Sequence, residues 1–237
     1  MKGRIDCGAR MRWIAPALLA LAYASGAAEY EVVKDESVFA VVTHKGGLAA
    51  RLAHNHLVQA GQYDVEFSMD ADNPATAAFS LSFAVKDLLV DVPEAQEKWF
   101  PGIRRMGILD TPFAALSEAD RKTIADHMLD KGQLDADQFP EIGVKLVSVR
   151  EQSQKKGDTE FGWTVTIALT VHGKTVEREC PANLTHEGAR VTVEAVGAFK
   201  FTEFGIRPYS AFMGAVKNRD DFHVYAHLVA DSKAGGN

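Results

Sequence analysis

Two stretches decide the fold, Leu169-Thr-Val-His-Gly-Lys-Thr175 and Gly197-Ala-Phe-Lys-Phe-Thr-Glu-Phe-Gly-Ile206. The first contains a His-Gly-Lys turn at the end of an alternating run that begins at Phe161. The second lies at the end of a long alternating run that begins at Arg190. In both runs an apolar side chain recurs at every second position, which is the period of a half-buried β-strand. Short turns between such runs predict antiparallel hairpins over the region Phe139 to Ala230.

Alternating runs also occupy much of the remaining chain. They are Glu29 to Thr43, Ala60 to Met69, Ala77 to Val85, Val144 to Val149, Thr175 to Leu184 and Phe222 to Val229. About eight antiparallel strands joined by short turns predict an all-β fold, either a sandwich or a closed barrel. A barrel of about eight strands can hold one small ligand inside, and its closure removes exposed strand edges.

One helix is expected within this all-β pattern. Ser117-Glu-Ala-Asp120 is typical of a helix start, with Ser117 as the cap. Helical spacing then continues from Ala119 to Leu129, and Gly132 ends the helix. The earlier segment Asp91 to Gly107 contains two prolines and is expected to be irregular.

Residues Met1 to Ala28 are typical of a secretory signal peptide. Four cations precede the short apolar run Trp13 to Tyr23, and small residues follow it. The apolar run is too short to span a bilayer. The pattern predicts cleavage near Ala28, a mature domain over residues 29–237 and a periplasmic location.

Charge and cysteine content exclude several classes of function. The chain has a formal net charge of −6, which makes nucleic acid a poor partner. Loss of the leader removes Cys7 and leaves Cys180 alone, so no internal disulfide can form and stability must come from a core. No base lies beside Cys180 in the sequence and no Gly-x-Ser-x-Gly motif occurs, so nothing indicates nucleophilic catalysis.

Three strand faces carry the candidate ligand-binding residues. An apolar row inside a barrel can line a tunnel for a hydrocarbon chain, whose burial is favourable by about 25 cal/mol per Å2. The candidates are Phe79, Leu81, Phe83, Val165, Ile167, Leu169, Val191, Val193, Phe199 and Phe201. Ala195 and Gly197 among these large residues favour a gap, although the same faces would also suit a packed core. Phe204 and Arg207 follow a strand end, where a headgroup could lie and Arg207 could bind a phosphate or quinone oxygen.

Histidines offer an alternative site. His54 and His56 flank Asn55 and would point to one side of an extended backbone, where they could chelate a metal ion together with His44. A metal-binding protein or metal-dependent enzyme is therefore the alternative function. The other interpretation of His54 and His56 is a polar cluster hydrogen-bonded to strand ends.

The order of these motifs resembles the YceI-like family. The resemblance rests on the helix, the strand entry Phe139-Pro-Glu-Ile142, the turn within Leu169 to Thr175 and the strand Phe199 to Ile206, and it extends from Tyr30 to Ala230. It implies a secreted, lipocalin-like antiparallel β-barrel of about eight strands with an inserted α-helix. It also implies an elongated apolar cavity that binds a polyisoprenoid, a prenyl quinone or a fatty amide, without catalysis, cofactor or membrane insertion.

Two segments depart from the family pattern. Pro93 to Asp120 is longer than the pattern and could extend a lid or reshape the cavity mouth, and Leu52 to Leu57 carries two histidines where the family often has one. Related barrels often pair, so a homodimer is one expected assembly. A structural module that delivers the barrel to a membrane partner is a further alternative function.

Overall fold

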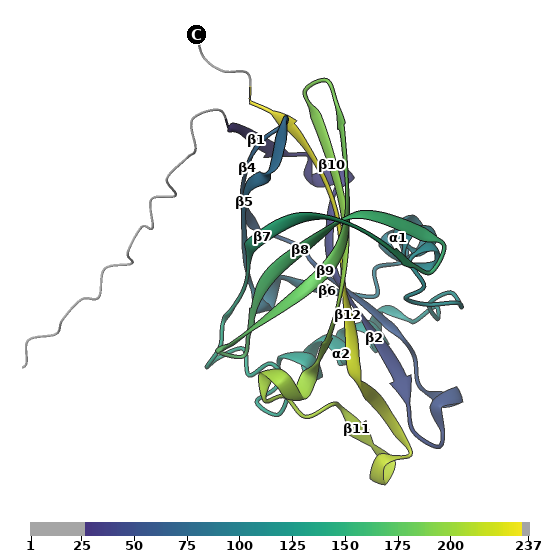
Figure 1. Ribbon diagram of the computed structural model, residues 1–237. Coiled ribbons are helices and arrows are strands. Elements are labelled where there is room, and N and C mark those ends of the chain that lie inside the picture. The colour runs from purple at the N-terminus through teal and green to yellow at the C-terminus, as the bar shows by residue number, and fades with distance from the viewer. Residues whose placement is uncertain (1–26, 234–237) are drawn as a thin grey trace, which may run out of the picture.

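The predicted strands form one antiparallel sheet in the computed structural model, which describes residues 27–233 (Figure 1). The strands are β1 (Ala28–Val32), β2 (Val38–Gly46), β3 (His56–Ala60), β4 (Asp64–Asp70), β5 (Asn73–Ala84), β6 (Leu88–Val90), β7 (Glu141–Lys156), β8 (Thr159–Val171), β9 (Lys174–Glu187), β10 (Arg190–Lys200), β11 (Ser210–Ala211) and β12 (Val216–Ser232). The short strands β3, β6 and β11 were not expected from the sequence, which placed a connection where β3 begins. Residues 1–26 of the predicted leader lie outside the described residues, so its cleavage stays a prediction.

Eight of these strands close into a ring. Their order is β1-β4-β5-β7-β8-β9-β10-β12, and β12 pairs back with β1. Tyr30 lies at the closure, opposite Phe67 on β4 and Ser232 on β12. The all-β, antiparallel, lipocalin-like fold predicted from the sequence is therefore confirmed.

Strand β12 joins the ring to a second group of strands. One edge of β12 pairs with β10 between Asp221 and Asp231, and the other edge pairs with β1 and with β2. Strands β3 and β6 follow β2 in the sheet order. The sheet thus continues past the ring through β2, β3 and β6, and β12 runs along both parts.

A helix that the sequence did not predict packs on the outer face of the ring. The segment Asp91 to Gly107, expected to be irregular, contains α1 (Pro93–Arg105). Pro93 is tolerated because it occupies the first turn, where its missing N–H has no partner in the helix. Ala95, Trp99 and Ile103 recur at every fourth position and form its buried face. The prolines therefore misled the prediction, because tertiary burial of this face outweighs their local effect.

Two close contacts hold α1 against its neighbours. Gly102 faces Tyr225 of β12, whose Oη would lie 2.6 Å from a Cβ at position 102. Gly107 and Gly157 meet where the β7–β8 hairpin reaches the end of α1, and Asp158 N donates to Arg105 O at 2.8 Å. Gly107 and Gly157 both have positive φ, 65° and 60°, which glycine adopts without strain.

Helix α2 (Glu118–Leu129) begins as predicted. Its cap, Ser117, accepts a hydrogen bond from Asp120 N at 3.1 Å. The helix lies beside β6 at the lower end of the ring in Figure 1, so it covers that end rather than the outer wall. The inserted helix of the prediction is therefore confirmed, and it is one of two α-helices within residues 27–233.

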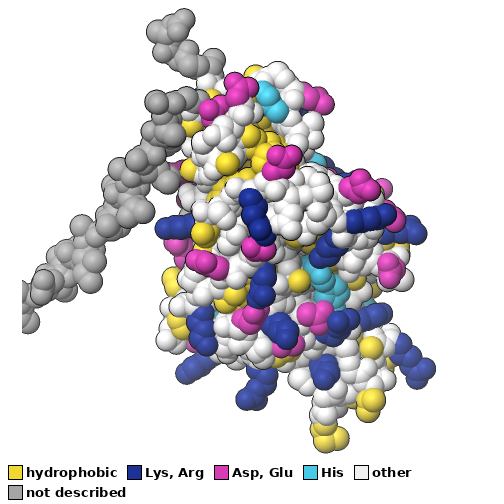
Figure 2. All heavy atoms as spheres, in the orientation of Figure 1, with side chains coloured by type: hydrophobic (Ala, Val, Ile, Leu, Met, Phe, Trp, Pro, Cys, Tyr) yellow, Lys and Arg dark blue, Asp and Glu magenta, His cyan; other side chains and the backbone are white. Residues whose placement is uncertain are grey.

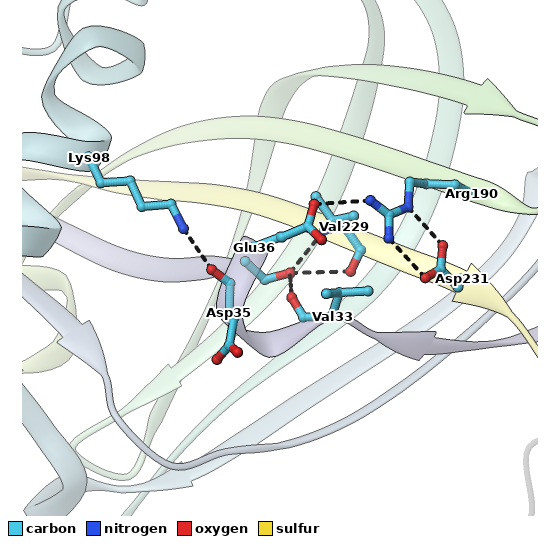
Figure 3. A network of polar contacts seen from close by, with 8 residues as sticks. Val33, Asp35, Glu36, Lys98, Arg190, Val229 and Asp231 are labelled. Atoms are coloured by element: carbon cyan, nitrogen blue, oxygen red, sulfur yellow. Dashed lines mark hydrogen bonds and ion pairs between the residues drawn. The ribbon is translucent and has the colours of Figure 1, made fainter.

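Polar contacts connect the closing strands with α1 (Figure 3). Arg190 of β10 donates to Asp231 of β12 at 2.8 and 3.0 Å and to Glu36 at 3.0 Å. Lys98 of α1 donates to Asp35 O at 2.6 Å. Exposed ion pairs contribute little to stability, so strand pairing and apolar burial stabilise the closed ring. The polar contacts fix the position of α1 relative to the closing strands.

The contact between Gly107 and Gly157 predicts a specific loss of stability. A Cβ at Gly157 would lie 2.5 Å from Gly107 N, whereas at Gly188, with φ of 64° in another hairpin turn, a Cβ would have no heavy atom within 4 Å. Gly157→Ala should lower the free energy of unfolding in urea by about 1–3 kcal/mol more than Gly188→Ala, since only the first adds overpacking to the backbone strain. Equal losses in the two variants would contradict this packing.

Candidate functional site

The ring, together with β2 and β3 beside it, encloses an apolar cavity of about 490 Å3. Strands β2 to β5, β7 to β10 and β12 supply inward side chains, and α2 supplies Thr123, Ile124, His127 and Met128 at one end. Most of the lining residues are aliphatic or aromatic. A cavity of this size and chemistry falls within the range of small-molecule sites in proteins.

Most of the residues predicted to bind ligand lie on this cavity. The residues that line it are Phe79, Leu81 and Phe83 of β5, Val165, Ile167 and Leu169 of β8, Val193 of β10, and Phe201 and Phe204 beyond β10. Their contact with a ligand stays a prediction, but the structure brings three separate strand faces together around one space.

Three predicted residues lie elsewhere. Val191 is fully buried in a core cluster with Tyr30. Phe199 is buried against Phe204 and Phe222, with ring centroids 6.1 and 5.9 Å away. Arg207 is exposed and does not line the cavity. The strand face to which Val191 and Phe199 belong is therefore divided between packed core and cavity wall.

Ala195 and Gly197 both line the cavity, but the space beside Gly197 is partly filled by its neighbours. The space that a Cβ would take is filled by Cys180 Sγ at 2.6 Å and by the Phe199 ring at 3.0 Å. Burial raises the pKa of the Cys180 thiol to about 12, so the thiol stays protonated at neutral pH. Cys180 thus acts as a small packing residue.

Several lining residues were missed by the sequence reasoning. They are Phe39 and Val41 on β2, Phe67 and Met69 on β4, Trp163 on β8, Ile124 and Met128 on α2, and Phe222, Val224, Ala226 and Leu228 on β12. The alternation of the runs that became β2, β4 and β12 was visible in the sequence. What was missing was the knowledge of which face of each strand turned inward.

The lid expected from residues Pro93 to Asp120 is not found. No residue of this segment lines the cavity, because its first half forms α1 on the outer face. The cavity end beside β6 is covered instead by α2 and by the residues that follow it, including Gln133 and Leu134.

One end of the cavity carries polar side chains. Thr43 of β2 and His56 of β3 pair directly across the two strands, and both line the cavity together with Asn218 of β12. Thr43 is only 7% exposed, and its Oγ1 has no hydrogen-bond partner within residues 27–233. An unpaired buried hydroxyl is costly, and it is a group that a bound ligand could satisfy.

Asp91 orients the His56 ring. Its carboxylate accepts from His56 Nδ1 at 2.6 Å, and also from Leu57 N at 2.9 Å and Gln96 Nε2 at 2.8 Å. Asp91 is 2% exposed, so these three donors compensate for its burial. Because Nδ1 is engaged, Nε2 is the ring nitrogen that remains for a ligand in the cavity.

The three histidines of the alternative metal site do not come together. His44 Nε2 lies 2.8 Å from His223 Nδ1, whereas the His54 ring lies edge-on to the His56 ring with centroids 6.4 Å apart. Within residues 27–233 no three His, Cys, Asp or Glu side chains are grouped to hold a metal ion. The structure therefore gives the alternative function no site at these residues.

The pair His44–His223 makes stability depend on pH. Burial, with a further contribution from the Lys156 ammonium, lowers the pKa of His223 to about 4. Burial also lowers the pKa of His44. The unfolded chain, whose His pKa is about 6.5, therefore binds more protons than the folded protein once the pH falls below that value.

We expect the free energy of unfolding to fall as the pH decreases from about 6.5 toward about 4. His223→Gln should make this decrease shallower, because the substituted side chain does not titrate. His186→Gln, at an exposed hairpin end, serves as the control and should keep the slope of the original protein. Urea unfolding at a series of pH values measures the slopes, and an unchanged slope in His223→Gln would contradict the assignment.

A closed antiparallel ring around an apolar cavity defines the class of lipocalin-like binding proteins. Comparison with known proteins narrows this class. A family model described as the YceI-like domain matches residues 30–230, and the chain therefore belongs to the YceI-like family. This family membership indicates a binding protein for a hydrophobic ligand.

Two solved structures share the fold. BcnA of Burkholderia cenocepacia aligns with a TM-score of 0.56 and 15% identity over 84% of this chain and 99% of that chain. A YCEI protein of Campylobacter jejuni aligns with a TM-score of 0.50 and 10% identity over 75% of this chain and 85% of that chain. At such low identity these likenesses show the fold alone. A search of the curated proteins found no match. Within residues 27–233, neither helix combines the length and the hydropathy of a bilayer span.

Proposed function

We propose that the protein is a periplasmic carrier that holds one long-chain amphiphile, such as a polyisoprenoid, a prenyl quinone or a fatty amide, in the cavity of its ring. The observation that carries this proposal is an apolar cavity of about 490 Å3 with a polar end. The periplasmic location rests on the leader-like sequence at residues 1–28.

The energetics suit a hydrocarbon chain. At about 25 cal/mol per Å2, burial of a tail with tens of carbons contributes on the order of 10 kcal/mol before ordering costs. What remains after those costs is enough for micromolar binding or better. No charged group is needed along the tail, and the middle of the cavity offers none.

The polar end supports binding rather than catalysis. The Thr43 hydroxyl has no hydrogen bond to His56 within the described residues, so His56 is not placed to activate it as a nucleophile. The Asp91 carboxylate already occupies His56 Nδ1, so the groups left at this end are the Thr43 hydroxyl and His56 Nε2, which suit a headgroup that can accept or donate hydrogen bonds. A hydroxyl, a quinone oxygen or an amide has this chemistry.

Filling the cavity should abolish binding. Ala195→Phe places a ring in the space that Ala195 lines, and we expect at least a tenfold weaker affinity for a fluorescent prenyl quinone analogue. Ala198→Phe is the matched control, because Ala198 lies three residues further along the same strand and is exposed. Organic extracts of the purified protein, analysed by mass spectrometry, should contain an apolar ligand for the original protein and the control only. The carrier function fails if the extracts are empty and the original protein takes up no prenyl quinone.

The hydroxyl of Thr43 should contribute to headgroup binding. Thr43→Val keeps the shape of the side chain and breaks no internal hydrogen bond, so the fold should be retained. We expect about a fivefold loss of affinity for a long-chain prenol, which corresponds to one ordinary hydrogen bond, and no loss for a hydrocarbon of the same length without a headgroup. Thr192→Val, outside the cavity lining on β10, is the control. If Thr43→Val lost affinity equally for the prenol and for the hydrocarbon, the headgroup would not bind at Thr43.

A further inference from the structure

Strands β2 and β12 extend past the ring and end in a projection at the bottom of Figure 1. We call residues 45–53 and 207–217 the tip. The two segments form one unit, because Gly46 pairs with Lys217 and Ala49 N donates to Ala215 O at 2.8 Å. β11 pairs with the start of β12 in the same unit. The tip is thus a hydrogen-bonded structure and not two independent loops.

The tip exposes large apolar side chains. Leu48, Leu52 and Met213 are 102%, 67% and 108% exposed, more than any other large hydrophobic side chain of the described residues. Figure 2 shows hydrophobic side chains gathered at this lowest point of the molecule. Such exposure at one place marks an interaction surface.

The tip is also basic, although the chain as a whole carries a net charge of −6. Neither residues 44–56 nor residues 205–219 contain Asp or Glu. Four of their cations, Lys45, Arg51, Arg207 and Lys217, belong to the tip, and Arg219 lies just beyond it. Within residues 27–233 only Arg219 among them forms an ion pair, with Asp221 at 2.9 Å. The tip therefore combines unneutralised positive charge with exposed apolar groups.

We propose that the tip docks on the surface of an anionic lipid bilayer. Leu48, Leu52 and Met213 insert at the boundary between headgroups and acyl chains, and the cations bind the anionic headgroups. A bilayer fits this combination, because its anionic headgroups complement the cations of the tip and its acyl chains accept the exposed apolar side chains without a matching surface.

The tip is continuous with the cavity. Tyr209 and Asn218 both line the cavity, and Asn218 N donates to Tyr209 O at 2.9 Å at the base of the tip. Docking therefore brings this end of the cavity to the bilayer surface. The docking proposal itself needs no ligand in the cavity, so it can be tested separately from the carrier function.

Sedimentation with lipid vesicles tests the proposal. The purified protein should bind vesicles that contain phosphatidylglycerol at least tenfold more tightly than vesicles of phosphatidylcholine, and added salt should weaken this binding. The triple variants Leu48→Ser/Leu52→Ser/Met213→Ser and Lys45→Glu/Arg51→Glu/Lys217→Glu should each lose at least tenfold in affinity. Circular dichroism confirms that the variants fold.

Matched variants away from the tip control for hydrophobicity and charge. Leu89→Ser/Val147→Ser replaces other exposed apolar side chains, and Lys131→Glu/Lys145→Glu/Lys155→Glu reverses other exposed lysines. Both should bind like the original protein, and so should Ala195→Phe, whose cavity is filled. Absence of binding to phosphatidylglycerol, or equal losses in tip and control variants, would overturn the proposal. So would a dimer in solution that the apolar tip variant dissociates, because the tip would then bind a second copy of the chain.

Discussion

The pairing of β12 with β1 is the constraint on which the rest of the structure depends. It closes eight strands into a ring, so each ring strand has a hydrogen-bonded neighbour on both sides. Once the ring is closed, the number of strands sets the distance between opposite walls. Inward side chains from opposite walls then meet only where they are large, and small ones such as Ala182, Ala195 and Ala226 leave room. The cavity follows from this closure.

The outer face of the ring explains how a hollow interior is compatible with a stable fold. Phe222 and Val224 of β12 point into the cavity, whereas Tyr225 is buried on the opposite face against α1. The cluster around Trp99 and Ile103 therefore buries apolar surface that the interior leaves open. Stability and binding are thus assigned to different faces of the same strands, and a ligand does not have to replace the packing of the core.

Polarity is arranged along the cavity in a way that suits an amphiphile. The walls are apolar, the end at Thr43 and His56 offers hydrogen bonds, and the tip beyond Asn218 is basic and apolar at its surface. Asp91 has positive φ of 50° and is buried, which is an unusual position for a carboxylate. Its three hydrogen bonds compensate for this position and hold His56 toward the cavity. The strained backbone at Asp91 therefore lies beside the proposed headgroup end.

The sequence by itself determined the longer strands, the cap of α2 at Ser117 and the family, because alternation, turn residues and capping are properties of neighbouring residues. It also pointed to part of the cavity wall, the inward faces of β5 and β8 and some residues on and after β10. Only the tertiary structure decided that Phe199 packs while Val193 lines the cavity, and that α1 exists despite its prolines. It alone showed that Asp91 binds His56 across 35 residues. These features depend on which strands become neighbours and which faces turn inward, and ring closure settles both through contacts between residues far apart in the chain.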